Sequence, residues 1–196
     1  MLARPVAAWF ALGCALVLTT SSDNKVTAAG KDRRFSSARH GVSVDAPAGW
    51  TLSLHTGYPS IIALLLHPTG SRISFAVAET TAITAAALIE QNRPGLQAQG
   101  LIVDRITDGV KGGAMVDAHG RARDEALRQY YLVRPVPKGA RQALVVTLTT
   151  KKDLLASMGP SLDLVLAHMT LESPAVDEST ASGGVTSRSR ADGSAD

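Results

Sequence analysis

Apolar and polar residues alternate with a period of two over several short stretches of this chain, which is the pattern of half-buried β-strands. Residues 41–45 (GVSVD) place Val42 and Val44 on one face, and the alternation resumes over residues 50–54 (WTLSL). Proline cannot donate to a strand ladder, and glycine tolerates a tight turn. The Pro-Ala-Gly sequence at 47–49 therefore predicts a turn between two strands.

Two strands that are apolar on both faces follow, at residues 61–66 (IIALLL) and 72–79 (RISFAVAE). Strands of this kind belong inside a sheet that is covered on both sides. Ala76 and Ala78 keep one face of the second strand small, which suits close packing of a helix. A Pro- and Gly-containing turn joins the two strands, so we expect a hairpin at the centre of the sheet.

The hydrophobic period then changes to that of a helix. The run AAALIEQN at 85–92 has high helix propensity, and either Thr81 or Thr84 is expected to cap it. Pro94 should kink or end this helix, because proline lacks the N–H group and clashes with the preceding turn. The sequence also allows a further turn or two through Leu96 to Gln99, which Gly100 would stop.

Strand-like stretches resume after this helix and are separated by glycine-containing turns. They lie at residues 101–106, 114–118, 126–134 and 143–150. A second helix is expected over residues 153–168, with an interruption at Pro160 and an apolar stripe at helical spacing beyond it. The order of these elements predicts an α+β fold.

The two ends of the chain differ from its middle. Residues 1–22 have a positive start and about thirteen consecutive apolar residues, fewer than the ~20 that span a bilayer, and are interpreted as a signal peptide. Residues 23–34 are interpreted as a polar linker, residues 35–172 as one domain, and residues 173–196 as a disordered tail. We therefore expect an exported protein of the periplasm, cell envelope or extracellular space.

Cys14 is the only cysteine, and Ala11-Leu12-Gly13-Cys14 resembles a bacterial lipobox. The usual leucine three places before the cysteine is Ala11 here, and apolar residues follow Cys14, where polar residues are usual. Cys14 is thus the candidate lipidation site, and contact with a membrane is expected only if it is lipidated. If Cys14 leaves with the signal peptide, the mature chain has no thiol for a disulfide, a zinc site or a nucleophile.

The sequence carries no reactive constellation. The five histidines fall at no metal-ligand spacing, and the chain has no G-x-S-x-G elbow or phosphate loop. Arg121, Arg123 and Arg128 lie beside Asp124 and Glu125, which is interpreted as a solvated edge with weak ion pairs. We predict no catalytic, metal-binding or cofactor-binding residues and no cofactor.

Two further observations concern partners. The net charge is +3 and the basic residues are scattered, so no nucleic-acid partner is expected. Trp50 is expected to fill the core, whereas Tyr58, in the loop before the central hairpin, is the candidate for an exposed contact with a partner.

GVSVDAPAGW (41–50) resembles the opening pattern of the PsbP/DcrB-like superfamily, with Val42 where an aromatic residue is common. QYYLVRPVPKGARQALVVTLTT (129–150) is similar to the penultimate hairpin of that superfamily, and PSLDLVLAHM (160–169) is similar to its final helix. The resemblance implies an α-β-α sandwich, with helices packed on an antiparallel sheet of about six strands. Its members are mostly non-enzymatic, although fold alone does not carry function.

These observations favour an exported, non-catalytic accessory protein of the cell envelope that binds a protein partner or an apolar ligand. Two alternatives remain. One is an envelope hydrolase or metal-dependent enzyme whose site is assembled from residues distant in sequence. The other is a chaperone-like binder of apolar helices, which requires an exposed apolar groove.

Overall fold

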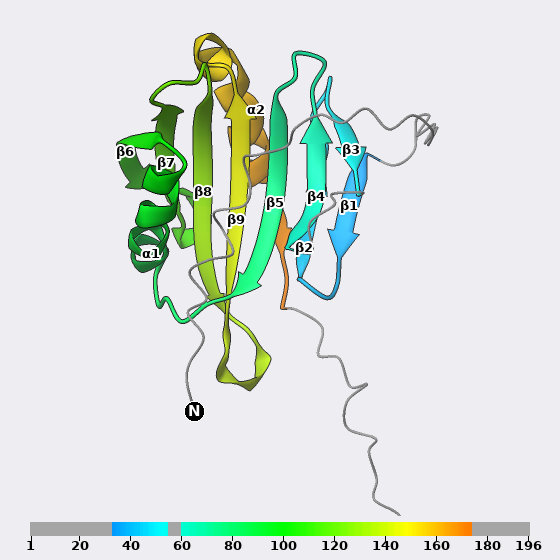
Figure 1. The fold of residues 1–196 in the computed structure, drawn as a ribbon. Helices are drawn as coiled ribbons and strands as arrows, with labels where there is room; N and C mark the ends of the chain where they lie inside the picture. Colours follow the sequence, from blue (N-terminus) through cyan, green and yellow to red (C-terminus); the bar gives the residue numbers. More distant parts are fainter. Residues whose placement is uncertain (1–32, 55–59, 174–196) are drawn as a thin grey trace, which may run out of the picture.

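The computed structural model describes residues 33–54 and 60–173, which form a seven-stranded antiparallel sheet, two helices and a small three-stranded sheet (Figure 1). The strands of the large sheet lie in the order β3 (Thr51–Ser53), β4 (Ile61–Leu66), β5 (Arg72–Glu79), β9 (Arg141–Thr150), β8 (Ala126–Pro135), β7 (Ala114–Gly120) and β6 (Leu101–Asp108). The α+β class predicted from the sequence is confirmed.

The small sheet has the order β1 (Arg34–Ser37), β2 (Val42–Asp45) and β10 (Thr170–Leu171). The sequence predicted one sheet of about six strands, whereas the large sheet has seven and the smaller sheet is separate. The Pro-Ala-Gly turn sends β2 and β3 into different sheets, because β2 pairs with the short strand that follows the last helix. The expected central hairpin is displaced, since β9 is the middle strand and β4 lies one strand from the edge.

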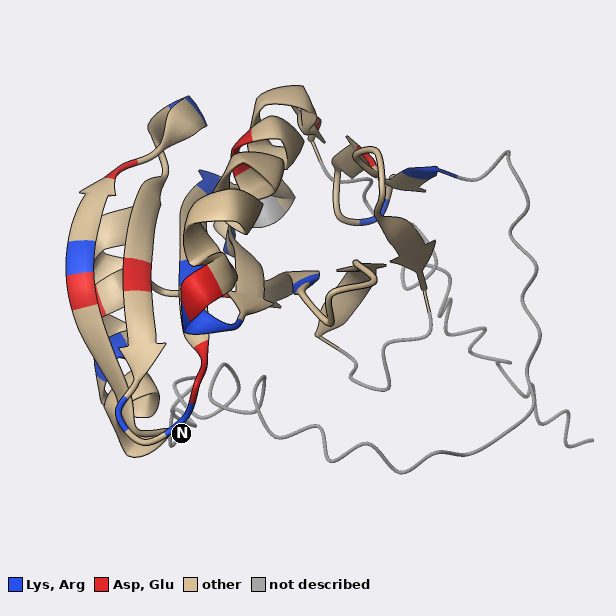
Figure 2. Ribbon diagram, turned by 90° about the horizontal axis from the view of Figure 1, so that it is seen from above, with Lys and Arg blue, Asp and Glu red and all other residues tan. Residues whose placement is uncertain are grey.

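The two helices, α1 (Ala85–Ala98) and α2 (Leu155–His168), pack on opposite faces of the large sheet. Alternate residues of β9 show this directly, because Val146 packs with α2 and Val145 packs with α1. Figure 2 views the molecule from above Figure 1, roughly along the strands, and shows α2 on one side of the sheet. The layers are therefore α-β-α. We call the two sides the α2 face and the α1 face.

Both helices run through a proline, and α1 ends just before Gly100, where the sequence allowed it to stop, whereas α2 shows no interruption at Pro160. Thr84 is the N-cap of α1 and its Oγ1 accepts from the Ala87 N–H at 3.1 Å. Pro94 lies inside α1, and Pro160 lies inside α2. Most helical stability in proteins comes from tertiary packing, and apolar side chains of each helix are buried against the sheet. Within the described residues, neither helix has the length and hydropathy needed to cross a membrane.

The α2 face holds the larger core, and Trp50 is part of it. Its side chain is 6% exposed and its ring centroid lies 5.1 Å from that of His67. Trp50 therefore fills the core, as the sequence predicted.

Arg134, on β8, joins the two sheets. Its guanidinium donates to the carbonyl oxygens of Gly41 at 3.0 Å and Glu172 at 2.9 Å, and also to that of His40. These three carbonyls come from the β1–β2 turn and from the residue after β10. His40 itself shares a hydrogen bond of 2.9 Å with Ser37 Oγ through Nδ1. Burial, and then the charges of Arg39 and Arg134, lower the pKa of His40.

The lowered pKa of His40 predicts a loss of stability on acidification. An unfolded chain binds a proton at a histidine near pH 6.5, whereas the folded chain resists this protonation. The contribution of neutral His40 to the free energy of unfolding is therefore present above pH 6.5 and is lost as the pH falls through the folded pKa. His40→Gln should lose less stability than the wild type between pH 7.5 and pH 5 in urea titrations. Equal losses in the two proteins would contradict this assignment.

Candidate ligand-binding cleft

A cleft of about 290 Å³ opens on the α2 face, where the sheet extends beyond α2. Its walls are β6, β7 and β8 on one side, α2 on the other, and the β6–β7 turn at one end. The cleft is lined by Arg105, Thr107, Asp108, Gly109, Val110, Met115, Asp117, Arg128, Asp163 and Leu166. Its volume is close to the lower end of the range for small-molecule sites, roughly 300–1,000 Å³.

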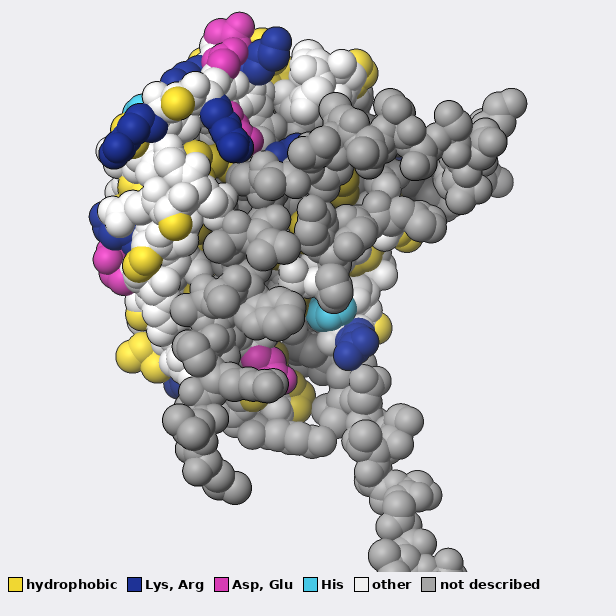
Figure 3. All heavy atoms as spheres, in the orientation of Figure 1, with side chains coloured by type: hydrophobic (Ala, Val, Ile, Leu, Met, Phe, Trp, Pro, Cys, Tyr) yellow, Lys and Arg dark blue, Asp and Glu magenta, His cyan; other side chains and the backbone are white. Residues whose placement is uncertain are grey.

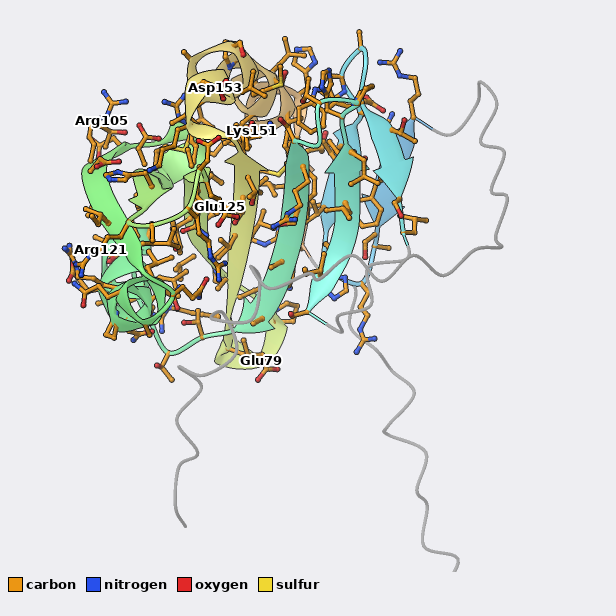
Figure 4. All side chains as sticks on the ribbon, turned by 45° about the horizontal axis from the view of Figure 1, so that its top comes forward. Glu79, Arg105, Arg121, Glu125, Lys151 and Asp153 are labelled. Carbon is orange, nitrogen blue, oxygen red and sulfur yellow. The ribbon has the colours of Figure 1, made fainter. Side chains whose placement is uncertain are left out.

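A row of three charged residues crosses the floor of the cleft. Asp117 on β7 lies opposite Arg105 of β6 and opposite Arg128 of β8 in the strand register. Its carboxylate accepts from Arg128 Nε at 2.7 Å, from Arg128 Nη2 at 3.2 Å and from Arg105 Nη2 at 2.8 Å. Arg105 is the outermost of the three because β6 is the edge strand of the sheet, and Figure 4 labels its side chain there.

The row keeps a buried carboxylate ionised. Asp117 is 9% exposed, and burial alone would raise its pKa. The hydrogen bonds and positive charges of Arg128 and Arg105 outweigh burial, so the pKa of Asp117 lies below its ordinary value. The hydrogen bond to Asp117 in turn raises the pKa of Arg128. Asp117 and Arg128 therefore form a charged pair at neutral pH.

Glycine at position 159 lets Arg128 pass beneath α2. A Cβ atom at this position would lie 2.7 Å from Arg128 Nη1, closer than side-chain carbons approach a neighbour. Any larger residue would displace a guanidinium that is already held by Asp117. The Gly159-Pro160 sequence, which suggested a helix break, instead marks the point where the helix and the charged row meet.

The β6–β7 turn closes one end of the cleft and is fixed from both sides. Lys111 has a φ of 55°, in the left-handed region that few residues other than glycine adopt, and its Nζ donates to Leu166 O at 2.6 Å. Tyr130 Oη donates to Val110 O at 2.8 Å, and burial raises the pKa of this phenol to about 12. The turn therefore joins the C-terminus of α2 to the sheet.

The charged row is better suited to hold a ligand group than to accept a proton. Asp117 already accepts three hydrogen bonds and has a lowered pKa, so it is a weak base. Arginine does not lose its proton in proteins. Among the described residues that line the cleft there is no His, Cys or Lys, and Thr107 carries the one hydroxyl.

One pair of groups resembles part of a catalytic site. His119 Nδ1 lies 2.8 Å from Asp104 Oδ2, beside the β-bulge in β6. Both side chains are partly exposed, at 35% and 46%, and neither lines the cleft. No cluster of three potential metal ligands occurs in the described part of the chain.

The structure locates some of the residues singled out from the sequence and not others. Cys14 and Tyr58 lie outside the described residues. Arg128 was interpreted with Asp124 and Glu125 as a solvated edge, but it lies over the α2 face and binds Asp117. The sequence analysis did not predict the cleft. One signal was available, because Arg128 is a charged residue at an inward-facing position of the strand at 126–134 and such a residue needs a partner.

Away from the cleft, charged side chains are scattered over the surface, as the sequence indicated. Figure 3 shows basic side chains interspersed with acidic ones on the face turned to the viewer. Arg72 Nη2, for example, lies 3.8 Å from Glu125 Oε1.

The charged row predicts a ranking of two substitutions. Asp117→Asn leaves Arg128 beneath α2 without its anion, and we expect the free energy of unfolding to fall by about 1–3 kcal/mol. Arg105→Gln removes a side chain that is 62% exposed, and we expect a loss below about 1 kcal/mol. Urea denaturation at pH 7 measures both. A loss in Arg105→Gln equal to that in Asp117→Asn would contradict the arrangement.

Comparisons with known proteins show the fold and nothing finer. No family model matches the chain, and a search of curated proteins finds no match. Among solved structures, LpqN of Mycobacterium tuberculosis, described as involved in cell envelope biogenesis, aligns with a TM-score of 0.52 at 15% identity, over 66% of this chain and 82% of LpqN. The cyanobacterial PsbP protein CyanoP of Synechocystis sp. PCC 6803 aligns with a TM-score of 0.52 at 14% identity, over 78% of this chain and 98% of CyanoP. The chain thus has a PsbP-like fold, as the resemblance of its sequence to the PsbP/DcrB-like superfamily implied.

Proposed function

We propose that this chain is an exported, non-catalytic binding protein of the cell envelope, and that it holds its ligand in the cleft between β6, β7, β8 and α2. The observation that carries the proposal is the charged row itself. Asp117 and Arg128 hold one another beneath α2, and Arg105 donates to Asp117 from the edge strand, which gives a preorganised set of polar groups without a proton-transfer pair. Such a site binds and orients a molecule and leaves its bonds intact.

The composition of the cleft refines the ligand class expected from the sequence. Met115, Val110 and Leu166 supply an apolar wall, while charged groups supply much of the remaining lining. A purely apolar ligand would leave those charges desolvated, at a considerable cost. The cleft therefore suits a small ligand, or one group of a protein partner, that has both polar and apolar parts.

Export is supported by the pattern of residues 1–22, and the likeness to LpqN is compatible with an envelope protein. In this proposal the signal segment is removed. Cys14 provides a membrane anchor only if processing takes place at the lipobox-like sequence. Lipidation would hold the domain at the membrane surface through the polar linker that the sequence predicts.

The two alternatives have less support. An enzyme would use His119 and Asp104, but within the described residues no hydroxyl or thiol is hydrogen-bonded to this histidine. A binder of apolar helices needs a continuous apolar groove. In the described part of the chain, the exposed large hydrophobic residues are instead scattered over several elements and loops, namely Leu54, Leu66, Ile83, Ile102, Ile106, Val110 and Leu164.

The proposal is tested by blocking the cleft. Thr107→Trp places a large ring in the cleft, whereas Ile106→Trp places the same ring on the opposite face of the same strand. The full chain is expressed in a bacterial host, purified from the envelope fraction and weighed by native mass spectrometry. We expect the wild type and Ile106→Trp to retain a non-covalent ligand and Thr107→Trp to lose it. A wild type without ligand, or retention in Thr107→Trp, would contradict the proposal.

The same preparation examines export and the anchor. We expect a mature chain that lacks its signal segment. A lipid-mass adduct and membrane retention, both lost in Cys14→Ser, would assign the anchor to Cys14. Recovery of the unprocessed chain from the cytoplasm would refute export.

A further inference from the structure

The strand β6 forms one edge of the large sheet (Figure 1), and in the described part of the chain no strand pairs with its outer side. It is eight residues long, and residues 104–108 are all exposed. The opposite edge of the sheet is β3, which has only three residues. A long, exposed edge strand presents N–H and C=O groups that are available for pairing with a further strand. The large sheet is therefore open to extension at β6.

The backbone hydrogen bonds beside β6 show which of its N–H groups point outward. Beyond one end of the strand, Gly109 N donates to Gly113 O at 2.9 Å. Beyond the other end, Arg121 N donates to Gly100 O at 2.8 Å. Hydrogen-bonded and non-hydrogen-bonded pairs alternate along an antiparallel ladder, so the outward positions follow by counting from each end to the β-bulge. They are Leu101, Val103, Ile106 and Asp108.

These outward positions match one another when β6 pairs with a second copy of itself. An antiparallel pairing centred on the middle of the strand places Val103 opposite the partner's Ile106, and Leu101 opposite the partner's Asp108. Each outward position then meets an outward position, so the two strands can exchange backbone hydrogen bonds. Val103 and Ile106 both lie on the α1 face, and Ile106 is 42% exposed, so the pairing also buries apolar surface.

The same pairing brings opposite charges together at its centre. Asp104 lies opposite the partner's Arg105, and the two-fold symmetry makes this pair occur twice. Both side chains are on the α2 face, because Arg105 binds Asp117 and Asp104 Oδ2 lies 2.8 Å from His119 Nδ1, two residues further along β7. Asp117 uses Nη2 of Arg105, while Nε and Nη1 have no hydrogen-bond partner among the described residues. Arg105 thus keeps donors for a second carboxylate.

Neighbouring registers lack this agreement. Sliding the partner by one residue places Asp104 opposite the partner's Asp104 or Arg105 opposite the partner's Arg105, depending on the direction. Like charges directly opposite one another destabilise a strand pair, and the outward backbone groups would also meet inward ones. Bulges and charged residues usually protect an edge strand from pairing. In β6 they do so in these registers, whereas in the centred register each charge meets its opposite.

From this agreement we infer that the protein pairs with a second copy of itself through β6, so that two seven-stranded sheets form one continuous sheet across a two-fold axis. The axis is perpendicular to the sheet, which keeps the α2 faces of the two copies on the same side. A contact limited to one strand pair belongs with the small interfaces, below ~1,200 Å² in total, which are typical of reversible complexes. The inference goes beyond the proposed function and does not depend on a ligand in the cleft.

Charge reversal on each side of the axis tests the register. In sedimentation equilibrium of the mature chain at low ionic strength, we expect the wild type to dimerise. Asp104→Lys and Arg105→Glu each create two like-charge pairs, and each should weaken dimerisation at least about tenfold, a difference of ~1.4 kcal/mol. An equimolar mixture of the two variants places opposite charges in both pairs and should dimerise about as tightly as the wild type.

Asp153→Lys and Arg123→Glu are the matched controls, because they make the same charge changes at exposed positions outside β6. Neither should alter dimerisation. Ile106→Pro removes an outward N–H group and no hydrogen bond to β7, so it should keep the circular dichroism of the wild type and lose the dimer. A wild type that stays monomeric up to about 1 mM, or a mixture that associates no more tightly than the single variants, would overturn the inference.

Hydrogen exchange at the Val103 amide identifies what covers the edge. With a second copy on β6, its protection should rise with protein concentration and be lost in Ile106→Pro. Protection that does not change with concentration would mean that a segment of the same chain covers β6. Protection that appears only when an unrelated extended peptide is added would mean that β6 accepts a foreign strand. Either result would overturn pairing with a second copy.

Discussion

Asp117 stays ionised beneath the edge of α2 because two guanidinium groups from neighbouring strands donate to it. Without both arginines, a carboxylate that is 9% exposed would have to bind a proton or disrupt its surroundings. Without the carboxylate, Arg128 would face the helix as an unmatched positive charge. The register of β6, β7 and β8 places these groups in one row, so the sheet supplies the charge balance before any ligand arrives.

The cleft exists because the large sheet is wider than the helix that covers it. α2 packs over the middle strands, and the α2 face of β6 and β7 extends past it. Lys111 and Tyr130 then fix the β6–β7 turn against the helix end and the sheet, which gives the cleft a closed end. Because these contacts are made by the fold itself, a ligand that entered the cleft would not have to order the β6–β7 turn.

The sequence predicted the individual helices and strands better than it predicted which strands and side chains lie next to one another in the fold. Strand alternation, a threonine cap at Thr81 or Thr84 and the burial of Trp50 depend on local pattern, and the structure has the alternation, the cap at Thr84 and the buried Trp50. The charged row depends on register between strands, which local pattern does not specify. Arg128 was therefore assigned to acidic residues close in sequence, whereas its partner lies eleven residues away on β7. The interruption predicted at Pro160 is absent for a related reason, since packing against the sheet outweighs a lost backbone hydrogen bond.

The central claim is that the cleft built around Asp117 is where this protein holds its ligand. A crystal structure of the protein purified from the envelope, without added ligand, tests this claim most directly. We expect electron density for a bound molecule in the cleft, in contact with Arg105 and facing Met115. A bound molecule elsewhere on the domain, with solvent alone beside Arg105, would contradict the account.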